Sequence, residues 1–214
     1  MIYLLSPLKK DGTTSLPMIS FEIVASNIDF SNCDTLMFTS KQAVVSANLI
    51  DKNWKNYPSI AIGGATKSKI EELGGEVIYH PKEFYAKSLS KDIKEKFSNK
   101  KLLYLRPKEV SFDSRGFLAK DNIELQEQII YETSCINYNQ SSKPKQNSII
   151  IFTSPSTIKC FFENFSWDES YIAVIIGKAT KKHLPDYCKY EIADVPLIDS
   201  CIKKAKEINK KSDI

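Results

Sequence analysis

The chain has 214 residues, 42% of them hydrophobic, and a formal net charge of +4 at pH 7. Its longest apolar runs, Ile149–Phe152 and Ile172–Ile176, are far shorter than the roughly 20 residues of a membrane-spanning helix, so the composition excludes such a helix and indicates one large or two small folded domains. The mild positive charge comes almost entirely from lysine. It favours an anionic small molecule as the ligand. A protein that binds nucleic acid would instead be expected to carry surface patches of arginine and aromatic residues.

Cysteine and histidine content limits the chemistry that the chain can perform. The five cysteines are odd in number and form no Cys-x-x-Cys pair, which favours reduced thiols in the cytoplasm. His80 and His183 have no cysteine or histidine near them at metal-ligand spacing. The apolar stretch at the N-terminus is too short for a signal peptide. We therefore expect a cytoplasmic protein with no bound metal. The cysteines are Cys33, Cys135, Cys160, Cys188 and Cys201.

Short β-rich runs alternate with helix-like periodicity along most of the chain, which predicts an α/β fold with parallel sheets and crossover helices. The connection at 7–17 is too short for a full crossover helix. The predicted strands are 2–5, 18–24, 35–39, 59–62, 76–79, 101–105, 125–131, 148–152, 172–176 and 190–193. The predicted helices are 43–50, 65–73, 86–97, 112–120, 157–165, 179–184 and 198–208.

An internal repeat is the strongest pattern in the sequence. Phe-Thr-Ser at 38–40 is followed 24 positions later by Ile-Gly-Gly-Ala-Thr at 62–66. Phe-Thr-Ser at 152–154 is followed at the same spacing by Ile-Gly-Lys-Ala-Thr at 176–180, so the two copies are shifted by 114 residues. A repeat of this length is too long for a solenoid unit and matches one small domain. It therefore predicts two similar lobes.

Two polar, turn-rich stretches predict where the chain passes between the lobes. We expect linkers at 27–33 and 134–147. The first lobe then consists of 1–26 together with 137–214, and the second lobe, 34–133, is inserted into it. Each lobe is expected to contain a five-stranded parallel sheet, with two strand-like crossings between them.

Each half of the repeated pattern lies where a strand gives way to a helix. In an open parallel sheet, ligands bind beyond the carboxyl ends of the strands, where helix N-termini offer backbone amides. Taken singly, these residues are ordinary helix caps and tight turns. Their recurrence in two lobes favours an anion site, in a cleft that the strand ends face from both sides. The candidate ligand-binding residues are Thr39, Ser40, Gly63, Gly64, Thr66, Thr153, Ser154, Ser156, Gly177, Lys178 and Thr180.

Two further residues fall at predicted strand ends. Arg106 offers a forked donor to an anion, or else forms a surface ion pair with an acid such as Glu109. Tyr131 offers a phenol that can assist a leaving hydroxyl, or else packs in the core with its hydroxyl satisfied. The chain contains no Gly-rich dinucleotide motif and no P-loop, so no cofactor is expected.

Taken in order, the motifs resemble those of the uroporphyrinogen-III synthase family over most of the chain. The resemblance implies two flavodoxin-like or Rossmann-like lobes joined by a two-stranded β linker, with the first lobe discontinuous. The chain departs from the family in its shortened first crossover around 9–15 and in having lysine at 178, where proline is common. The motifs are 37–44 (MFTSKQAV), 61–66 (AIGGAT) with Leu73 and Gly74, 103–106 (LYLR) with Arg115 and Leu118, 130–133 (IYET), 152–156 (FTSPS) and 175–180 (IIGKAT).

The resemblance implies a hydro-lyase (EC 4.2.1.75) of haem biosynthesis. Such an enzyme closes hydroxymethylbilane, a linear tetrapyrrole with eight carboxylates, into uroporphyrinogen III while inverting the last pyrrole ring and releasing water. The hydroxyl and glycine residues would hold carboxylates, Arg106 or Lys178 would neutralise some of them, and Tyr131 would act as the catalytic group. We expect a monomer, because nothing in the sequence suggests a long apolar surface seam. We expect it to act without cofactor, nucleic acid or membrane and to make transient contact with the preceding pathway enzyme.

Binding proteins remain alternatives to an enzyme. A two-lobed solute-binding protein shares the double crossing but should carry an export signal. A regulatory domain for a phosphosugar or nucleotide would also use helix N-termini. The alternative function is therefore a cytoplasmic two-lobed binding protein for a polyanionic small molecule.

Overall fold

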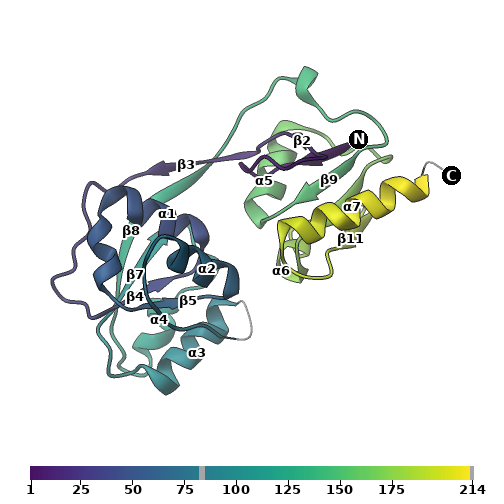
Figure 1. Ribbon diagram of the computed structural model, residues 1–214. Helices are drawn as coiled ribbons and strands as arrows, with labels where there is room; N and C mark the ends of the chain where they lie inside the picture. The colour runs from purple at the N-terminus through teal and green to yellow at the C-terminus, as the bar shows by residue number, and fades with distance from the viewer. Residues whose placement is uncertain (82–84, 213–214) are drawn as a thin grey trace. The chain divides into compact units, whose positions relative to one another are not determined.

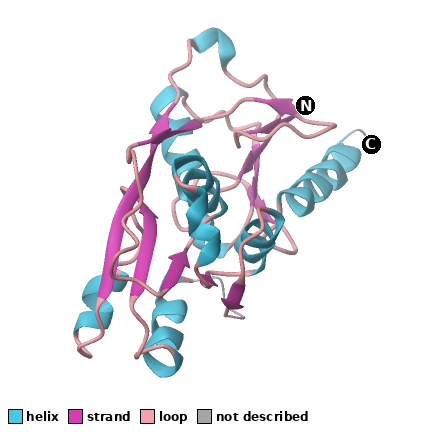
Figure 2. Ribbon diagram, turned by 60° about the vertical axis from the view of Figure 1, so that its left-hand side comes forward, coloured by secondary structure: helices cyan, strands magenta, loops and turns pink. Residues whose placement is uncertain are grey.

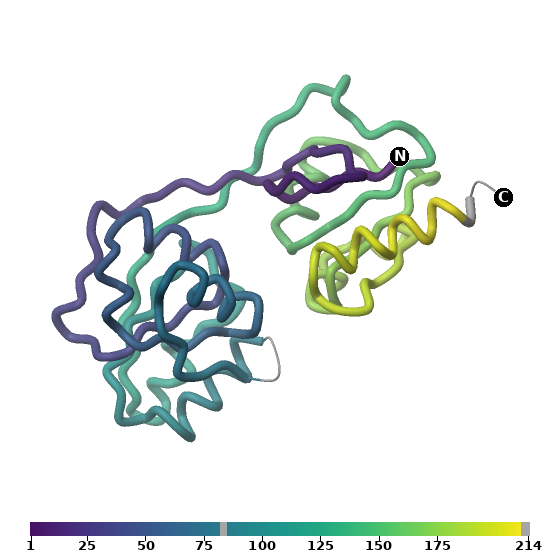
Figure 3. The backbone as a smooth tube through the Cα atoms, in the orientation of Figure 1, coloured from purple at the N-terminus to yellow at the C-terminus, as the bar shows by residue number. Residues whose placement is uncertain are grey.

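Two sheets organise the computed structural model, which describes residues 1–81 and 85–212 (Figure 1). The chain divides into two units: unit 1 consists of Met1–Ser20 and Ser134–Ile214, and unit 2 of Phe21–Thr133. The backbone passes from one unit to the other twice (Figure 3). The predicted α/β class with parallel sheets is confirmed.

Unit 2 contains a six-stranded sheet in the order β3-β8-β7-β4-β5-β6. Neighbours from β8 to β6 are parallel. The buried central strands are nearly continuous apolar runs, as expected where helices cover both faces. The strands are β3 (Ile19–Ile23), β4 (Thr35–Phe38), β5 (Ser59–Ala61), β6 (Val77–Tyr79), β7 (Leu102–Pro107) and β8 (Leu125–Cys135).

Helices alternate with the strands and cover both faces of this sheet (Figure 2). One core cluster joins Phe38 and Leu105 of the sheet to Val44 of the first helix. The other joins Met37 of the sheet to Leu89 of the third helix. The helices are α1 (Lys41–Ile50), α2 (Gly64–Glu72), α3 (Ala86–Lys96) and α4 (Ser114–Ala119), with a 3-10 turn η1 at Lys52–Asn56.

Unit 1 contains a five-stranded parallel sheet in the order β11-β10-β9-β1-β2. Its two faces are covered by α5 with α6 on one side and by α7 on the other. The strands are β1 (Ile2–Leu4), β2 (Thr14–Ser15), β9 (Ile149–Phe152), β10 (Ile172–Ile175) and β11 (Tyr190–Ile192). The helices are α5 (Pro155–Asn164), α6 (Lys178–Lys181) and α7 (Ile198–Ser212), with a 3-10 turn η2 at Gln140–Ser142.

The repeat corresponds to equivalent positions in the two sheets. The 114-residue shift places β4, β5 and β6 on β9, β10 and β11. In unit 2, the next strand beside β4 is β7, which follows β6 in the chain. In unit 1, the next strand beside β9 is β1, which is the first strand of the chain. Unit 1 is therefore a circular permutation of the same strand order.

The strand and linker boundaries differ from the sequence prediction in three places. The strand expected at 18–24 belongs to the sheet of unit 2, and the five-stranded sheet takes β2 instead. The predicted linker 27–33 lies within unit 2, where Ile28 is buried. The predicted linker 134–147 lies within unit 1, where Tyr138 donates a hydrogen bond to the Pro17 carbonyl. Polarity suggested exposed linkers, but a few apolar and hydrogen-bonding side chains anchor both stretches.

The expectation of five reduced thiols is wrong for one pair. Cys135 at the end of β8 and Cys160 in α5 form a disulfide, with their Cα atoms 5.2 Å apart. The pairing joins a strand end to a helix, so no local motif signals it. Cys33, Cys188 and Cys201 are free. Among the described helices, none combines the length and apolar character needed to cross a membrane.

Candidate functional site

Two tyrosines flank the carboxyl end of β4. The hydroxyls of Thr39 and Tyr104 lie 2.5 Å apart, and those of Ser40 and Tyr131 lie 2.9 Å apart. Tyr104 belongs to the core cluster beneath α3 and α4, whereas Tyr131 belongs to the cluster beneath α1 and α2. Two successive hydroxyl residues therefore each meet a buried phenol, one from each face of the sheet.

The turn from β4 into α1 explains why Ser40 faces this position. Ser40 is extended, and its Oγ accepts a hydrogen bond of 3.0 Å from the Ala43 amide, which makes it the N-cap of α1. The first amides of a helix have no partner within the helix and carry partial positive charge. The first turn of α1 contains no acidic side chain and begins with Lys41. This strand end is therefore suited to an anion.

Both phenols stay protonated at neutral pH. Burial raises the pKa of Tyr104 to about 12, partly offset by the hydrogen bond with Thr39. Burial also raises the pKa of Tyr131, and the hydrogen bond with Ser40 opposes that effect. Each phenol can therefore donate a proton or a hydrogen bond, and a hydroxyl partner stabilises the phenolate if a proton leaves.

The end of β5 is the second candidate position in unit 2. Gly63 is the N-cap of α2 and offers no side-chain hydrogen bond to the helix. A Cβ built on Gly64 meets nothing within 4 Å, so the backbone there is open to a ligand. Thr66 is only 4% exposed, and no side-chain hydrogen bond joins its hydroxyl to another described residue. The turn thus combines free helix amides with a hydroxyl that is not committed elsewhere.

Unit 1 repeats this arrangement at the ends of β9 and β10. Ser154 caps α5 in a reciprocal capping box with Thr157, and Ser156 lies in the first turn. Gly177 precedes α6, and a Cβ built on it meets nothing within 4 Å. Thr180 is 4% exposed, like its counterpart Thr66. Thr153, Gly177 and Lys178 complete the set predicted from sequence.

Arg106 is bound within the protein. Its Nε lies 3.2 Å from Oε2 of Glu127, and both side chains are largely buried. The Nε atom is not aligned for a hydrogen bond, so the contact is an ion pair. Its Nη1 donates to the carbonyls of Pro107 and Lys108. Of the two interpretations of Arg106, the structure shows an ion pair, with Glu127 and not Glu109.

Lys178 offers a cation in the other unit. Its side chain is exposed and begins α6, directly after the Gly177 turn. No described acid forms an ion pair with it. Lys178 is therefore the freer of the two cations predicted from sequence to meet an anionic ligand.

Two other features could be taken for sites. Ligand atoms of Cys135, Cys160 and Glu163 lie within 4.8 Å of one another among the described residues, but the two cysteines form the disulfide, so their sulfurs are not thiolate ligands.

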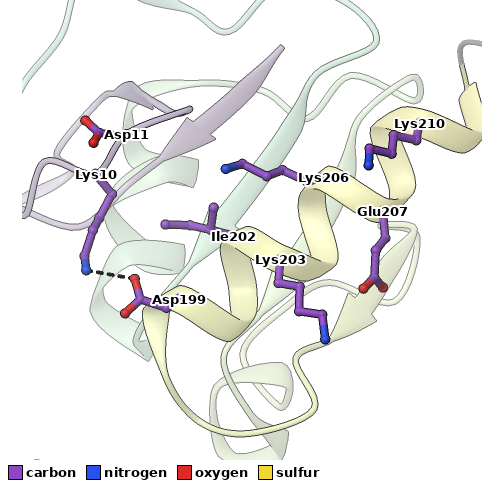
Figure 4. A pocket seen from close by; sticks show the side chains of 8 residues that line it. All are labelled: Lys10, Asp11, Asp199, Ile202, Lys203, Lys206, Glu207 and Lys210. Atoms are coloured by element: carbon purple, nitrogen blue, oxygen red, sulfur yellow. Dashed lines mark ion pairs between the residues drawn. The ribbon is translucent and has the colours of Figure 1, made fainter.

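A hollow of about 610 Å³ lies beside α7 in unit 1, where Lys10 pairs with Asp199 at 2.8 Å (Figure 4). The hollow has a structural explanation. In unit 2, the crossover from β7 to β8 contains α4, which packs beside α3. In unit 1, the corresponding crossover from β1 to β2 is too short for a helix, so no described helix fills that position beside α7.

Sequence reasoning missed Tyr104 and Glu127. Tyr104 lies in an otherwise aliphatic strand, Leu-Leu-Tyr-Leu at 102–105. A tyrosine hydroxyl in a run expected to be buried indicates a hydrogen-bond partner, and this signal could have identified Tyr104. Glu127 gave no signal, because its pairing with Arg106 depends on the register of β7 and β8.

The fold and the site define a class: a doubly wound α/β protein whose candidate site consists of helix N-termini, hydroxyls and buried phenols. The chain belongs to the uroporphyrinogen-III synthase HemD family, whose model matches residues 12–203. The family resemblance found in the sequence is confirmed.

Individual relatives agree with this assignment. The chain is 31% identical over 157 residues to the porphyrin biosynthesis protein HemD of Ruminiclostridium josui, an alignment covering 69% of this chain and 31% of that protein. The chain thus spans about a third of the length of that curated relative. The uroporphyrinogen-III synthetase structure from Helicobacter pylori 26695 matches 97% of this chain and 98% of its own, with a TM-score of 0.78 and 26% identity. A mutant uroporphyrinogen III synthase from Thermus thermophilus shares the fold, with a TM-score of 0.59, 12% identity and 98% of each chain covered.

Proposed function

We propose that this protein cyclises hydroxymethylbilane to uroporphyrinogen III, inverting the last pyrrole ring and releasing water. The observation that carries the proposal is the neutral phenol of Tyr131, held 2.9 Å from Ser40 at a strand end suited to anions. Family membership supplies the reaction to which this geometry is applied.

Tyr131 is proposed as the proton donor to the leaving hydroxyl. Ser40 Oγ already accepts the Ala43 amide, so its own proton is free to be donated to the phenol oxygen. In that orientation Ser40 does not use the Tyr131 proton, which would be available to the substrate. As the proton moves to the departing hydroxyl, water is formed, and the Ser40 hydrogen bond stabilises the phenolate that remains.

The proton balance of the reaction closes at the same residue. Departure of the hydroxyl as water, with the proton from Tyr131, leaves an azafulvenium cation, and the substituted carbon of the last ring attacks its methylene carbon to give a spiro intermediate. Fragmentation and reclosure then place a proton on the α-carbon of that ring, and this proton must leave to restore the pyrrole. We propose that the Tyr131 phenolate accepts it, so that the enzyme ends in its starting protonation state.

The strand edge of each unit is proposed to bind carboxylates of the substrate. Eight carboxylates outnumber the cations that these edges carry, Lys41 and Lys178 with the ion-paired Arg106, so helix amides and hydroxyls must hold most of them. Thr39, Ser40, Gly63, Gly64 and Thr66 would do so in unit 2. Thr153, Ser154, Ser156, Gly177 and Thr180 would do so in unit 1, and Lys178 would neutralise part of the charge. Arg106 would act on the electrostatics of the site through Glu127.

Holding the substrate is itself the main catalytic task. Free hydroxymethylbilane closes without inversion, so the enzyme has to favour a conformation in which the azafulvene reaches the substituted carbon first. The test is to supply freshly generated hydroxymethylbilane and separate the isomers. The inverted isomer supports the proposal, and only the uninverted isomer at the spontaneous rate rejects it.

A further inference from the structure

Tyr104 forms a second phenol–hydroxyl pair that the proposed reaction does not use. Its side chain is 3% exposed, and its hydroxyl lies 2.5 Å from Thr39 Oγ1. Thr39 is only partly buried at the carboxyl end of β4. Thr39 therefore lies between a buried phenol and the edge where the ligand is expected.

The chemistry of the two groups favours one direction for their hydrogen bond. Ser40 Oγ already accepts the Ala43 amide, but Thr39 Oγ1 accepts from no other described group, so it is open to a donor. A phenol is a much stronger acid than an aliphatic hydroxyl, so Tyr104 is the better donor to this open acceptor. When Thr39 accepts from Tyr104, its own proton is free and becomes a stronger donor, because linked hydrogen bonds polarise one another. The pair thus presents an outward O–H, the group that a carboxylate binds.

The repeat shows that the fold does not need this phenol. Tyr104 of β7 pairs with Met37 of β4. The same shift of 114 residues relates Met37 to Ile151 of β9, whose partner in β1 is Leu4. Leu4 is fully buried, as an apolar residue at this position should be. One copy of the sheet therefore packs with leucine where the other carries a hydroxyl.

We propose that Tyr104 is a positioning residue, which orients the Thr39 hydroxyl as a donor to a carboxylate of the substrate. This inference rests on the proposed function. Tyr104 acts through Thr39 and not on the reacting atoms, so its loss weakens substrate binding. Tyr131, in contrast, acts in the chemical step. The two phenols on the two faces of the same sheet thus have separate roles.

Steady-state kinetics with hydroxymethylbilane distinguish these roles. We expect Tyr104→Phe to raise KM about 5- to 10-fold with kcat changed less than twofold, because uniform binding is lost. Thr39→Val should produce the same rise, and Thr39→Ser, which keeps the hydroxyl, should restore most of the affinity. The double variant Tyr104→Phe/Thr39→Val should be no worse than Thr39→Val alone, because the two groups act as one unit.

A matched control separates positioning from folding. Tyr138→Phe removes a phenol that donates to the Pro17 carbonyl in unit 1, so it should change thermal stability and leave KM unchanged. An unchanged KM in Tyr104→Phe, or additive effects in the double variant, would overturn the inference. If Tyr104→Phe does not fold, the Thr39→Val variant provides the test. An unchanged KM in Thr39→Val also overturns the inference. Failure of the proposed function is seen separately, as a wild-type protein that forms no inverted isomer.

Discussion

Ser40 Oγ lies 2.9 Å from the hydroxyl of Tyr131, although 91 positions separate the two residues in the chain. The same oxygen caps α1 through the Ala43 amide. One serine thus fixes the start of a helix and the hydrogen bonding of a buried phenol. The proposed proton donor is tied in this way to the helix terminus that is expected to bind anions.

Removing the Tyr131 hydroxyl should slow turnover more than removing a ligand-binding hydroxyl. We expect Tyr131→Phe to lower kcat about 100-fold, within the usual range for loss of a general acid. Thr66→Ala should mainly raise KM, because its hydroxyl would hold only one carboxylate among eight. Rates of uroporphyrinogen III formation measure both. Undiminished turnover in Tyr131→Phe would remove that residue from the mechanism.

Ser40→Ala should affect both stability and rate. Loss of an N-cap costs about 1 kcal/mol, and loss of the Tyr131 partner should lower kcat by about 10-fold. Asp113→Ala is the matched control, because Asp113 caps α4 through the Gly116 amide and contacts neither tyrosine. Urea unfolding and kcat should separate the two variants: similar loss of stability, with a loss of rate only in Ser40→Ala. Equal rates in both would contradict the role of the Ser40–Tyr131 pair.

Gly177→Ala tests whether a ligand approaches the backbone there. The glycine is extended and a Cβ meets nothing within 4 Å, so alanine should leave the melting temperature unchanged. If a substrate carboxylate sits on the amides of this turn, the methyl group should raise KM about 5-fold or more. Gly75→Ala is the contrasting variant, since its Cβ would collide with the Trp54 ring and destabilise the fold. A Gly177→Ala enzyme with unchanged KM would exclude close contact at this turn.

Stability should fall as the pH rises above 10. Tyr104 is protonated in both states below pH 10, the usual pKa of the unfolded chain, and in the folded state its pKa is about 12. Between these values the unfolded state loses its proton first, so the free energy of unfolding decreases with pH. Burial raises the pKa of Tyr171 to about 12 as well, so it contributes in the same direction.

The variant Tyr104→Phe identifies the share of that effect that belongs to Tyr104. Urea unfolding at pH 9 and pH 11 should give a smaller loss of stability in Tyr104→Phe than in the wild type. The same loss in both proteins would show that Tyr104 does not titrate with a raised pKa.

Most strands and helices were predictable because their apolar periodicity is strong and each lies between clear turns. The strand at 18–24 was predicted at the right place but assigned to the wrong sheet, since pairing is a tertiary property. The very short strand Thr14–Ser15 has too few residues to show a pattern. The disulfide of Cys135 with Cys160 also depends on tertiary structure alone.

The candidate site was predictable only in part. The repeat located Ser40, Gly177 and their counterparts, because each follows a strand and begins a helix. The pairing of Ser40 with Tyr131, and of Thr39 with Tyr104, depends on which strands lie side by side. The cytoplasmic location and the monomeric state stay predictions.

The hydroxyls and amides at these strand ends are proposed to direct inversion of the last ring. The most direct test of this proposal is the isomer distribution formed from freshly generated hydroxymethylbilane by the wild-type protein, compared with the Tyr131→Phe variant and with buffer alone. We expect almost entirely uroporphyrinogen III from the wild type. We expect a large share of the uninverted isomer I from Tyr131→Phe, because that variant is too slow to compete with spontaneous closure. Isomer I from the wild type, at the rate seen in buffer, would contradict the proposal.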